Sequence, residues 1–153
     1  MASNPQLPTG SEPRTVSVWF QTSSTASGYQ ALLNWGVSSS RQRFGLTVIS
    51  SGPFFTGQFA DVRPTNSVDV RDGQWHHLAA AYDGTEDRLW LDGAIIGVGT
   101  PTLTTANQVL LLGQKIGSSE FYDGNLDDVR VYDYALTDVE LDAIYRENGW
   151  PSP

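Results

Sequence analysis

Short segments in which apolar and polar residues alternate run along most of the chain. Residues 15–21 show the pattern clearly, since every second residue, Val16, Val18 and Phe20, is apolar and falls on one face of an extended strand. Comparable segments, each bounded by Gly, Ser, Asn, Asp or Pro, occupy residues 30–36, 43–50, 54–62, 74–83, 87–92, 94–99, 108–113 and 126–134. The pattern predicts nine short strands.

The connections between these segments are too short for helical crossovers. Parallel strands need a dozen or more residues between them, usually helical, and no such stretch occurs before the C-terminal part of the chain. No internal repeat of fixed period and no low-complexity segment is present. We therefore expect antiparallel sheets, with Asp83-Gly84 and Asp92-Gly93 in tight turns of primed type.

One helix is predicted, near the C-terminus. Thr137 and Glu140 have the spacing of a capping box, and Leu136 and Leu141 that of a hydrophobic staple. Gly149 supplies the stop. A narrow apolar stripe on this helix would dock it as a lid over a sheet edge or corner: Leu141, Ile144 and Tyr145.

Composition fits a single all-β domain. The 153 residues amount to one domain, 39% of them hydrophobic, and 15 Gly with 8 Pro supply many turns. The net charge of -8 disfavours nucleic acid and anionic lipid as partners, while neutral ligands and cations stay compatible with it. The absence of Cys excludes disulfides and thiol chemistry. No segment resembles a membrane span or a signal peptide.

Four motifs resemble those of laminin-G-like domains, the jelly-roll sandwiches grouped with concanavalin A. Residues 15–20 resemble the family's Thr-Val-Ser-x-Trp strand, residues 74–84 its Trp-His-His strand, and residues 89–93 its Trp-x-Asp-Gly strand. Residues 124–137 resemble its closing strand and helix entry. The resemblance implies a two-sheet antiparallel jelly-roll β-sandwich with a short C-terminal helix, and it points to sugar or protein binding.

The N-terminal part departs from this family pattern. Residues 1–13 hold three prolines and little apolar periodicity, so they are predicted to form an extended lead-in before one domain at 14–150. Many family members begin with an additional strand that has no clear match here. Either residues 4–7 replace it in altered form, or the sequence begins after it. If that strand is missing, an exposed sheet edge would allow edge-to-edge homo-oligomers. The start Met1-Ala2-Ser3 is typical of an expressed piece of a longer protein.

The two histidines and the carboxylates give mixed chemical signals. His76 and His77 are adjacent on a strand and face opposite sides of the sheet, which favours a structural role over a metal site. Several aspartates cluster near turns, where oxygen ligands suit calcium, and related domains often carry that ion. Asp123 and Asp127 are the predicted calcium ligands, although Asp-Gly turns explain other members of the cluster.

Hydrolytic chemistry has weak support. Glucanases of this broad fold place paired carboxylates on one strand, and the nearest match, Glu140 with Asp142, lies in the predicted helix. Asp127 and Asp128 are neighbours on a strand, so their side chains diverge. No Gly-x-Ser-x-Gly elbow is present, although composition alone leaves a Ser-His-Asp arrangement open. The sequence therefore predicts a protein that is not an enzyme.

Aromatic side chains in or beside loops are the candidate ligand contacts. A sugar ring offers an apolar C–H face and a rim of hydroxyls, so its sites combine an aromatic platform with polar side chains. Any single one of these rings can equally serve the core. The predicted ligand-binding residues are Tyr29, Arg41, Arg43, Phe54, Phe55, Gln58, Trp90, Phe121 and Tyr122.

These observations lead to one expectation and three alternatives. We expect a non-catalytic, lectin-like glycan-binding module of a larger secreted or cell-surface protein, without membrane insertion and with calcium as the one candidate cofactor. A protein-binding or adhesion module that recognises an extracellular protein stays open, as does an architectural domain. A glycoside hydrolase is the most distant alternative.

Overall fold

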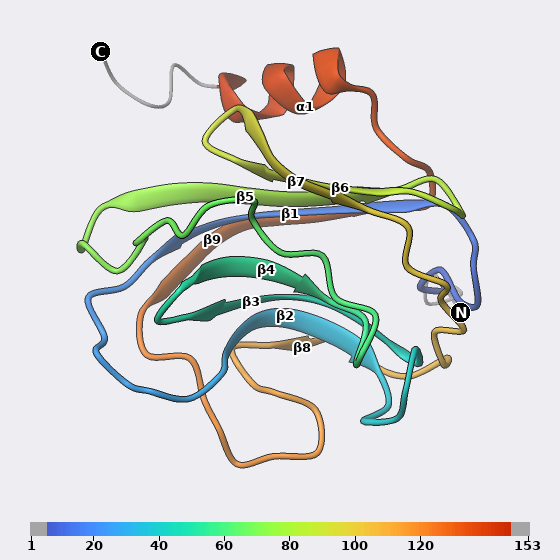
Figure 1. The fold of residues 1–153 in the computed structure, drawn as a ribbon, viewed down its shortest axis with the longest axis horizontal. Helices are drawn as coiled ribbons and strands as arrows, with labels where there is room; N and C mark the ends of the chain where they lie inside the picture. The colour runs from blue at the N-terminus through green and yellow to red at the C-terminus, as the bar shows by residue number, and fades with distance from the viewer. Residues whose placement is uncertain (1–5, 148–153) are drawn as a thin grey trace, which may run out of the picture.

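Nine strands and one helix make up residues 6–147, the part of the chain that the computed structural model describes (Figure 1). The first five strands are β1 (Arg14–Gln21), β2 (Gln30–Gly36), β3 (Arg43–Ile49), β4 (Gly52–Thr56) and β5 (Trp75–Tyr82). They are followed by β6 (Asp87–Leu91), β7 (Ala94–Gly99), β8 (Leu111–Leu112), β9 (Asn125–Tyr132) and α1 (Asp138–Tyr145). Within this part of the chain, no helix is both long and apolar enough to cross a membrane.

The strands form two antiparallel sheets that lie face to face (Figure 1). One sheet has five strands in the order β7-β6-β5-β1-β9, and the other has four in the order β4-β3-β2-β8. Every strand pair is antiparallel, as the short connections predict. The predicted all-β sandwich with a C-terminal helix is confirmed.

Alternate residues of the facing strands fill the space between the sheets. Val16, Val18 and Phe20 of β1 are fully buried there, as their spacing predicts. Trp35 and Phe44 lie opposite each other on β2 and β3, with ring centroids 4.8 Å apart. Burying such large side chains is the main source of stability in a sandwich of this size.

Two predicted strands are shorter than their apolar segments. Residues 54–62 do not form one strand, because β4 ends at Thr56 and the chain turns back so that Val62 pairs with Phe55. Gln58 and Phe59 have positive φ angles of 56° and 68°, which reverse the chain direction. Residues 108–113 contribute β8 alone, which pairs with two residues of β2.

The two Asp-Gly sequences form different turns. Asp92 and Gly93 have φ angles of 50° and 81° and join β6 to β7 as a two-residue primed turn, as predicted. The turn at Asp83 is wider, because residues 83–86 separate β5 from β6. The Asp83 carboxylate accepts hydrogen bonds from the amides of Thr85 and Glu86, at 2.8 and 2.7 Å. These bonds from the Asp83 side chain stabilise a wider turn in place of the tight primed turn that the sequence predicted.

Helix α1 lies on the outer face of the five-stranded sheet (Figure 1). Its capping box is present, since Thr137 and Glu140 bond each other's backbone amides. Leu136 and Leu141 are buried against Trp90 on that face, so the helix covers a face and not the edge or corner we predicted. Gly149, the predicted stop, lies outside the described residues.

Residues 6–13 are packed against the sandwich, although the sequence predicted a lead-in segment. Leu7 contacts the core, and the Pro8 carbonyl accepts a hydrogen bond of 2.9 Å from the Trp35 indole. Gly10 pairs with Thr105. This segment therefore closes one end of the sandwich.

Candidate functional site

The outer face of the four-stranded sheet has a floor of small and polar side chains. Strand pairing places these residues on the side opposite the core: Ala31, Asn34, Gly45, Thr47 and Thr56. They are buried because loop residues lie over them. The loop that follows β8 hangs below this sheet in Figure 1. We call this surface the outer face.

The loop after β8 is fixed to the outer face by Asn34. The Asn34 side-chain amide donates a 2.7 Å hydrogen bond to the Gln114 carbonyl and accepts one of 3.1 Å from the Ile116 amide. Because both bonds are to backbone, they set the position of the chain on either side of Lys115.

Two aromatic rings and two cations form a row across the outer face. The Tyr29 and Phe54 ring centroids are 6.1 Å apart in an edge-to-face arrangement. The Lys115 ammonium lies 4.6 Å from the Tyr29 ring centroid, and the Arg63 guanidinium lies 4.1 Å from that of Phe54. Both contacts are within cation–π range. The four residues are referred to below as the ring–cation row.

Each cation of the row also forms an ion pair with a carboxylate. Lys115 lies 2.5 Å from Glu120, and Arg63 lies 3.4 Å from Asp61. The Lys115 ammonium lowers the pKa of Glu120, so this carboxylate stays ionised in weak acid. Hydrogen-bond donors and acceptors thus flank the two rings, as they do in sugar sites.

Two arginines at or just before the N-terminal end of β3 form no ion pair with any described residue. Arg41 is exposed, and its backbone amide donates to the Gln58 carbonyl at 2.8 Å. Arg43 is buried and donates to the Ser38 hydroxyl and the Ile116 carbonyl at 3.2 and 3.1 Å. Burial lowers the pKa of Arg43, because little water reaches its guanidinium.

Besides Arg43, three of the predicted ligand contacts are buried, which corrects the prediction. Phe55 is fully buried in the core, and Trp90, 7% exposed, lies beneath α1. Phe54 is 1% exposed, so it supports the ring of Tyr29 and does not offer a free surface. The alternation pattern gives the face of each side chain correctly but does not show which segment covers it.

The other predicted contacts are spread over the outer face and its rim. Tyr29 is 45% and Phe121 65% exposed, and Phe121 lies on the loop that Asn34 holds. Tyr122 donates its hydroxyl to the Gln21 carbonyl at 2.8 Å, and burial raises its pKa, so it supports a chain corner. Gln58 is half-buried in the positive-φ turn.

Three residues of this region were missed at the sequence level. Phe59 is 82% exposed at the tip of the turn after β4, and Arg63 and Lys115 complete the ring–cation row. Lys115 is the one lysine of an acidic chain, and this feature of the sequence could have marked it as a candidate. The place of Arg63 depends on the unexpected return of the chain beside β4.

The two histidines have structural roles on opposite faces of β5. The His76 ring nitrogens lie 2.7 Å from Asp92 and 3.2 Å from Asp72, and the bond to Asp92 raises the pKa of His76. His77 is buried beneath α1, with its ring 5.2 Å from that of Trp19. Within residues 6–147, no serine hydroxyl is hydrogen-bonded to either histidine.

We expect His77 to make the fold sensitive to acid. Burial lowers the pKa of His77 to about 4, so the unfolded chain binds more protons than the folded one between that value and about 6.5. Stability contributed by neutral His77 is therefore present above pH 6.5 and is lost as the pH falls. When the pH is lowered from 7 to 4.5, the free energy of unfolding of His77→Phe should therefore fall by about 2 kcal/mol less than that of the parent protein. Thermal unfolding followed by circular dichroism at both pH values measures the difference. An unchanged pH dependence would contradict this assignment.

The predicted calcium ligands lie in different places relative to β9. Asp123 lines a polar rim cavity of about 300 Å³ with Thr22, Ser24 and Asn125, whereas Asp127 lies opposite Trp19 on the outer side of β1 and β9. Among the described residues, no group of three or more His, Asp or Glu side chains is placed to hold a metal ion. Asp123 precedes β9, whereas Asp127 lies in β9 on its outer side, and their joint role as calcium ligands stays a prediction.

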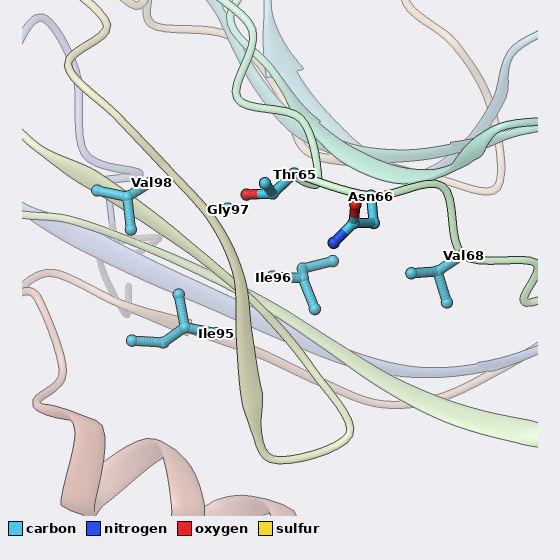
Figure 2. Close-up of a pocket in the computed structure, with 7 residues that line it drawn as sticks. All are labelled: Thr65, Asn66, Val68, Ile95, Ile96, Gly97 and Val98. Carbon is cyan, nitrogen blue, oxygen red and sulfur yellow. The ribbon is translucent and has the colours of Figure 1, made fainter.

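A second cavity, of about 380 Å³, lies at the seam between the two sheets. Its walls are β7 and residues 65–68, which Figure 2 shows on either side of it. Ile95, Ile96, Val68 and Val98 supply most of the lining, and no charged or aromatic side chain contributes. The cavity has polar groups on Thr65 and Asn66 but no aromatic ring on which a sugar could stack.

Comparison with known proteins agrees with this architecture. A family model described as the concanavalin A-like lectin/glucanases superfamily, of laminin-G type, matches residues 2–142. The chain belongs to this superfamily. The resemblance seen in the four sequence motifs is thereby confirmed. Comparison with the curated proteins finds no match.

Several solved structures have a fold similar to that of this chain. Domain 4 of AbnA, a GH43 extracellular arabinanase from Geobacillus stearothermophilus in complex with arabinotriose, is 20% identical with a TM-score of 0.67, covering 91% of this chain and 68% of that one. The CBM40 of the Ruminococcus gnavus IT-sialidase, bound to α2,3-sialyllactose, is also 20% identical, with a TM-score of 0.67 and coverage of 88% and 83%. Domains LG4-5 of the mouse laminin α1 chain are 17% identical, with a TM-score of 0.61 and coverage of 82% and 37%.

The carboxylates considered for a glucanase-type reaction have structural partners in this protein. Glu140 belongs to the capping box, and Asp142 pairs with Arg146 at 2.9 Å. Asp128 pairs with Arg130 at 2.7 Å, as their spacing on one strand face predicts. The candidate pairs named from the sequence thus have other roles.

Proposed function

We propose that the protein is a non-catalytic module that binds glycan on the outer face of its four-stranded sheet. The observation that carries the proposal is the ring–cation row. It places the exposed ring of Tyr29 against Phe54 and sets charged hydrogen-bonding groups on both sides.

The chemistry of the row fits a sugar. The apolar C–H face of a pyranose or furanose ring can stack on Tyr29, and the hydroxyls on its rim can bond to nearby polar groups. Lys115 and Arg63 supply donors, while Glu120 and Asp61 supply acceptors. Because Phe54 supports the Tyr29 ring from below the surface, the platform is held before any ligand arrives.

The relatives and the larger context support the same proposal. Two fold relatives are named as complexes with arabinotriose and α2,3-sialyllactose. We infer that the module belongs to a secreted or cell-surface protein and holds it near polysaccharide. Binding by one module is modest, and several modules in one chain would strengthen it.

Removing the Tyr29 ring should abolish most of the binding. In Tyr29→Ala, affinity for the glycan found on an array should fall by about tenfold, which is about 1.4 kcal/mol of stacking. Tyr29→Phe keeps the ring and should keep the affinity. Tyr134→Ala is the matched control, because Tyr134 is similarly exposed but contacts Tyr132 beyond β9. Isothermal titration calorimetry measures the three affinities.

Two outcomes would count against the proposal. Absence of binding to every glycan on the array would remove the lectin function altogether. Equal affinity in Tyr29→Ala and Tyr134→Ala would move the site away from the outer face.

Binding to an extracellular protein is the second candidate, and the edge strand β7 favours it. Ile95 and Val98 are exposed there beside the apolar seam cavity (Figure 2). Apolar surface at a sheet edge suits contact with another polypeptide. Ile95→Lys would separate the two functions, since it should leave glycan affinity unchanged.

A calcium requirement also stays a proposal, and of its two predicted ligands Asp123 is the one that lines the rim cavity. The rim cavity offers hydroxyl and amide oxygens around one carboxylate, which is few charges for a calcium ion. Repeating the glycan array with calcium and with chelator tests the requirement, and Asp123→Asn tests the position.

A further inference from the structure

Charge is divided unevenly between the two halves of the sandwich. Residues 28–63 and 111–122 form the four-stranded sheet with its loops, and we call them the four-stranded half. This half holds four of the nine cationic side chains but only two of the seventeen carboxylates. Its charged residues are Arg41, Arg43, Arg63 and Lys115, with Asp61 and Glu120.

The remainder of the described chain is strongly acidic, and its surface cations are neutralised. Each surface arginine there has a carboxylate partner, in the pairs Arg71 with Asp69, Arg88 with Asp138, Arg130 with Asp128 and Arg146 with Asp142. Arg14 is internal. The positive charge that this part offers to a ligand is therefore small.

The four-stranded half contains two arginines that form no ion pair with any described carboxylate. Arg41 makes no ion pair with any described residue and is exposed in the loop between β2 and β3. Arg43 is bonded to neutral oxygens alone, and its buried Nε has no hydrogen-bond partner. Asp61 offsets part of the cost of burying Arg43, whereas no carboxylate pairs with the exposed Arg41. This half of the molecule therefore keeps an excess of positive charge.

We propose that the ligand of the outer face is an acidic glycan, one that carries carboxylate or sulfate groups. This proposal rests on the glycan-binding function proposed above and names its substrate class. Guanidinium and ammonium groups bond such anions strongly. Arg41 is exposed and forms no ion pair with any described carboxylate, so its guanidinium is open to a ligand. The acidic remainder of the protein repels the same polymer, which orients it onto this side.

Affinity gel electrophoresis tests the substrate class directly. The protein is run through gels that contain polygalacturonate, alginate or chondroitin sulfate, and through gels that contain arabinan, galactan or xylan. Non-specific retention by the acidic polymers is disfavoured, because the net charge of the protein is -8. We expect retardation in at least one acidic gel, weakening as NaCl is added.

A matched pair of arginine variants tests the location. Arg41→Gln should weaken binding to the retarding polymer by about tenfold, the loss of one charge-assisted contact. Arg146→Gln changes the net charge by the same amount, and Arg146 is the C-cap residue of α1, the helix on the far side of the sandwich (Figure 1). It should leave retardation unchanged. Arg41→Lys keeps the charge and should keep most of the affinity.

The outcomes separate the two proposals. Retardation in neutral gels alone, or equally in both kinds, overturns the acidic ligand and leaves glycan binding intact. No retardation in any gel counts against both. Equal losses in Arg41→Gln and Arg146→Gln also overturn the acidic site, since net charge alone would then explain the effect.

Discussion

Replacing Arg14 by Met should cost the fold about 3–5 kcal/mol, the effect of breaking a buried polar network. The Arg14 guanidinium is fully buried and donates to four backbone carbonyls, those of Glu12, Pro8, Thr9 and Gly10, over 2.7–3.0 Å. It therefore holds the whole N-terminal segment against the end of the sandwich. Each carbonyl left unpaired in the interior costs about 1–3 kcal/mol.

Packing and charge add to this loss. The Arg14 guanidinium lies 5.2 Å from the Phe44 ring centroid and 5.8 Å from that of Tyr82. Asp87 is buried nearby with neither carboxylate oxygen hydrogen-bonded, and burial raises its pKa to about 8. Burial lowers the pKa of Arg14 to about 10, so the arginine is still charged at neutral pH and its field favours the ionised Asp87.

Thermal unfolding measures the prediction. For a domain of this size the melting temperature of Arg14→Met should fall by roughly 10 °C. Arg14→Lys keeps the charge but lacks the planar fork, so it should lie between the variant and the parent protein. Arg146→Met is the control, since its exposed i,i+4 pair with Asp142 is worth about 0.5 kcal/mol. A change of less than 2 °C in Arg14→Met would contradict the network, given about 2–4 °C per kcal/mol.

The sequence predicted the elements well because their causes are local. Alternation in residues 15–21 reflects one buried and one outward face, and the capping box at Thr137 needs only the next three residues. The early turn after Thr56 is also local, but its positive-φ residues are Gln58 and Phe59, which carry no glycine signal. That is why β4 was predicted to be too long.

The candidate site was harder to predict because its causes are long-range. Trp90 faces outward, as its alternation with Leu89 and Leu91 predicts, but α1 covers it from more than forty residues later in the chain. Phe54 lies on the outer face beneath Tyr29 and Arg63, which come from two other segments. An alternation pattern shows which side a residue faces, but not what lies over that side. Lys115 reaches the row because hydrogen bonds from Asn34 and Arg43 hold its loop on the outer face.

The two hydrogen bonds of Asn34 to this loop give the second prediction with a large expected effect. In Asn34→Ala, the Gln114 carbonyl and the Ile116 amide lose their partner, so the free energy of unfolding should fall by about 2–3 kcal/mol. The loop then moves away from the outer face and takes Lys115 with it. Glycan affinity should fall by about tenfold, because one cation of the row is no longer held in place. Asn125→Ala is the control, since its 3.0 Å bond to Gln21 is exposed.

A lysine-specific protease can follow the loop by itself, because Lys115 is the one lysine in the chain. Cleavage there gives two fragments, residues 1–115 and 116–153, and needs the loop to leave the sheet. Asn34→Ala should be cut at least about tenfold faster than the parent protein, and Asn125→Ala at the parent rate. Faster cutting with unchanged glycan affinity would show that Lys115 does not contribute to glycan binding. Unchanged cutting and unchanged stability would show that Asn34 does not hold the loop.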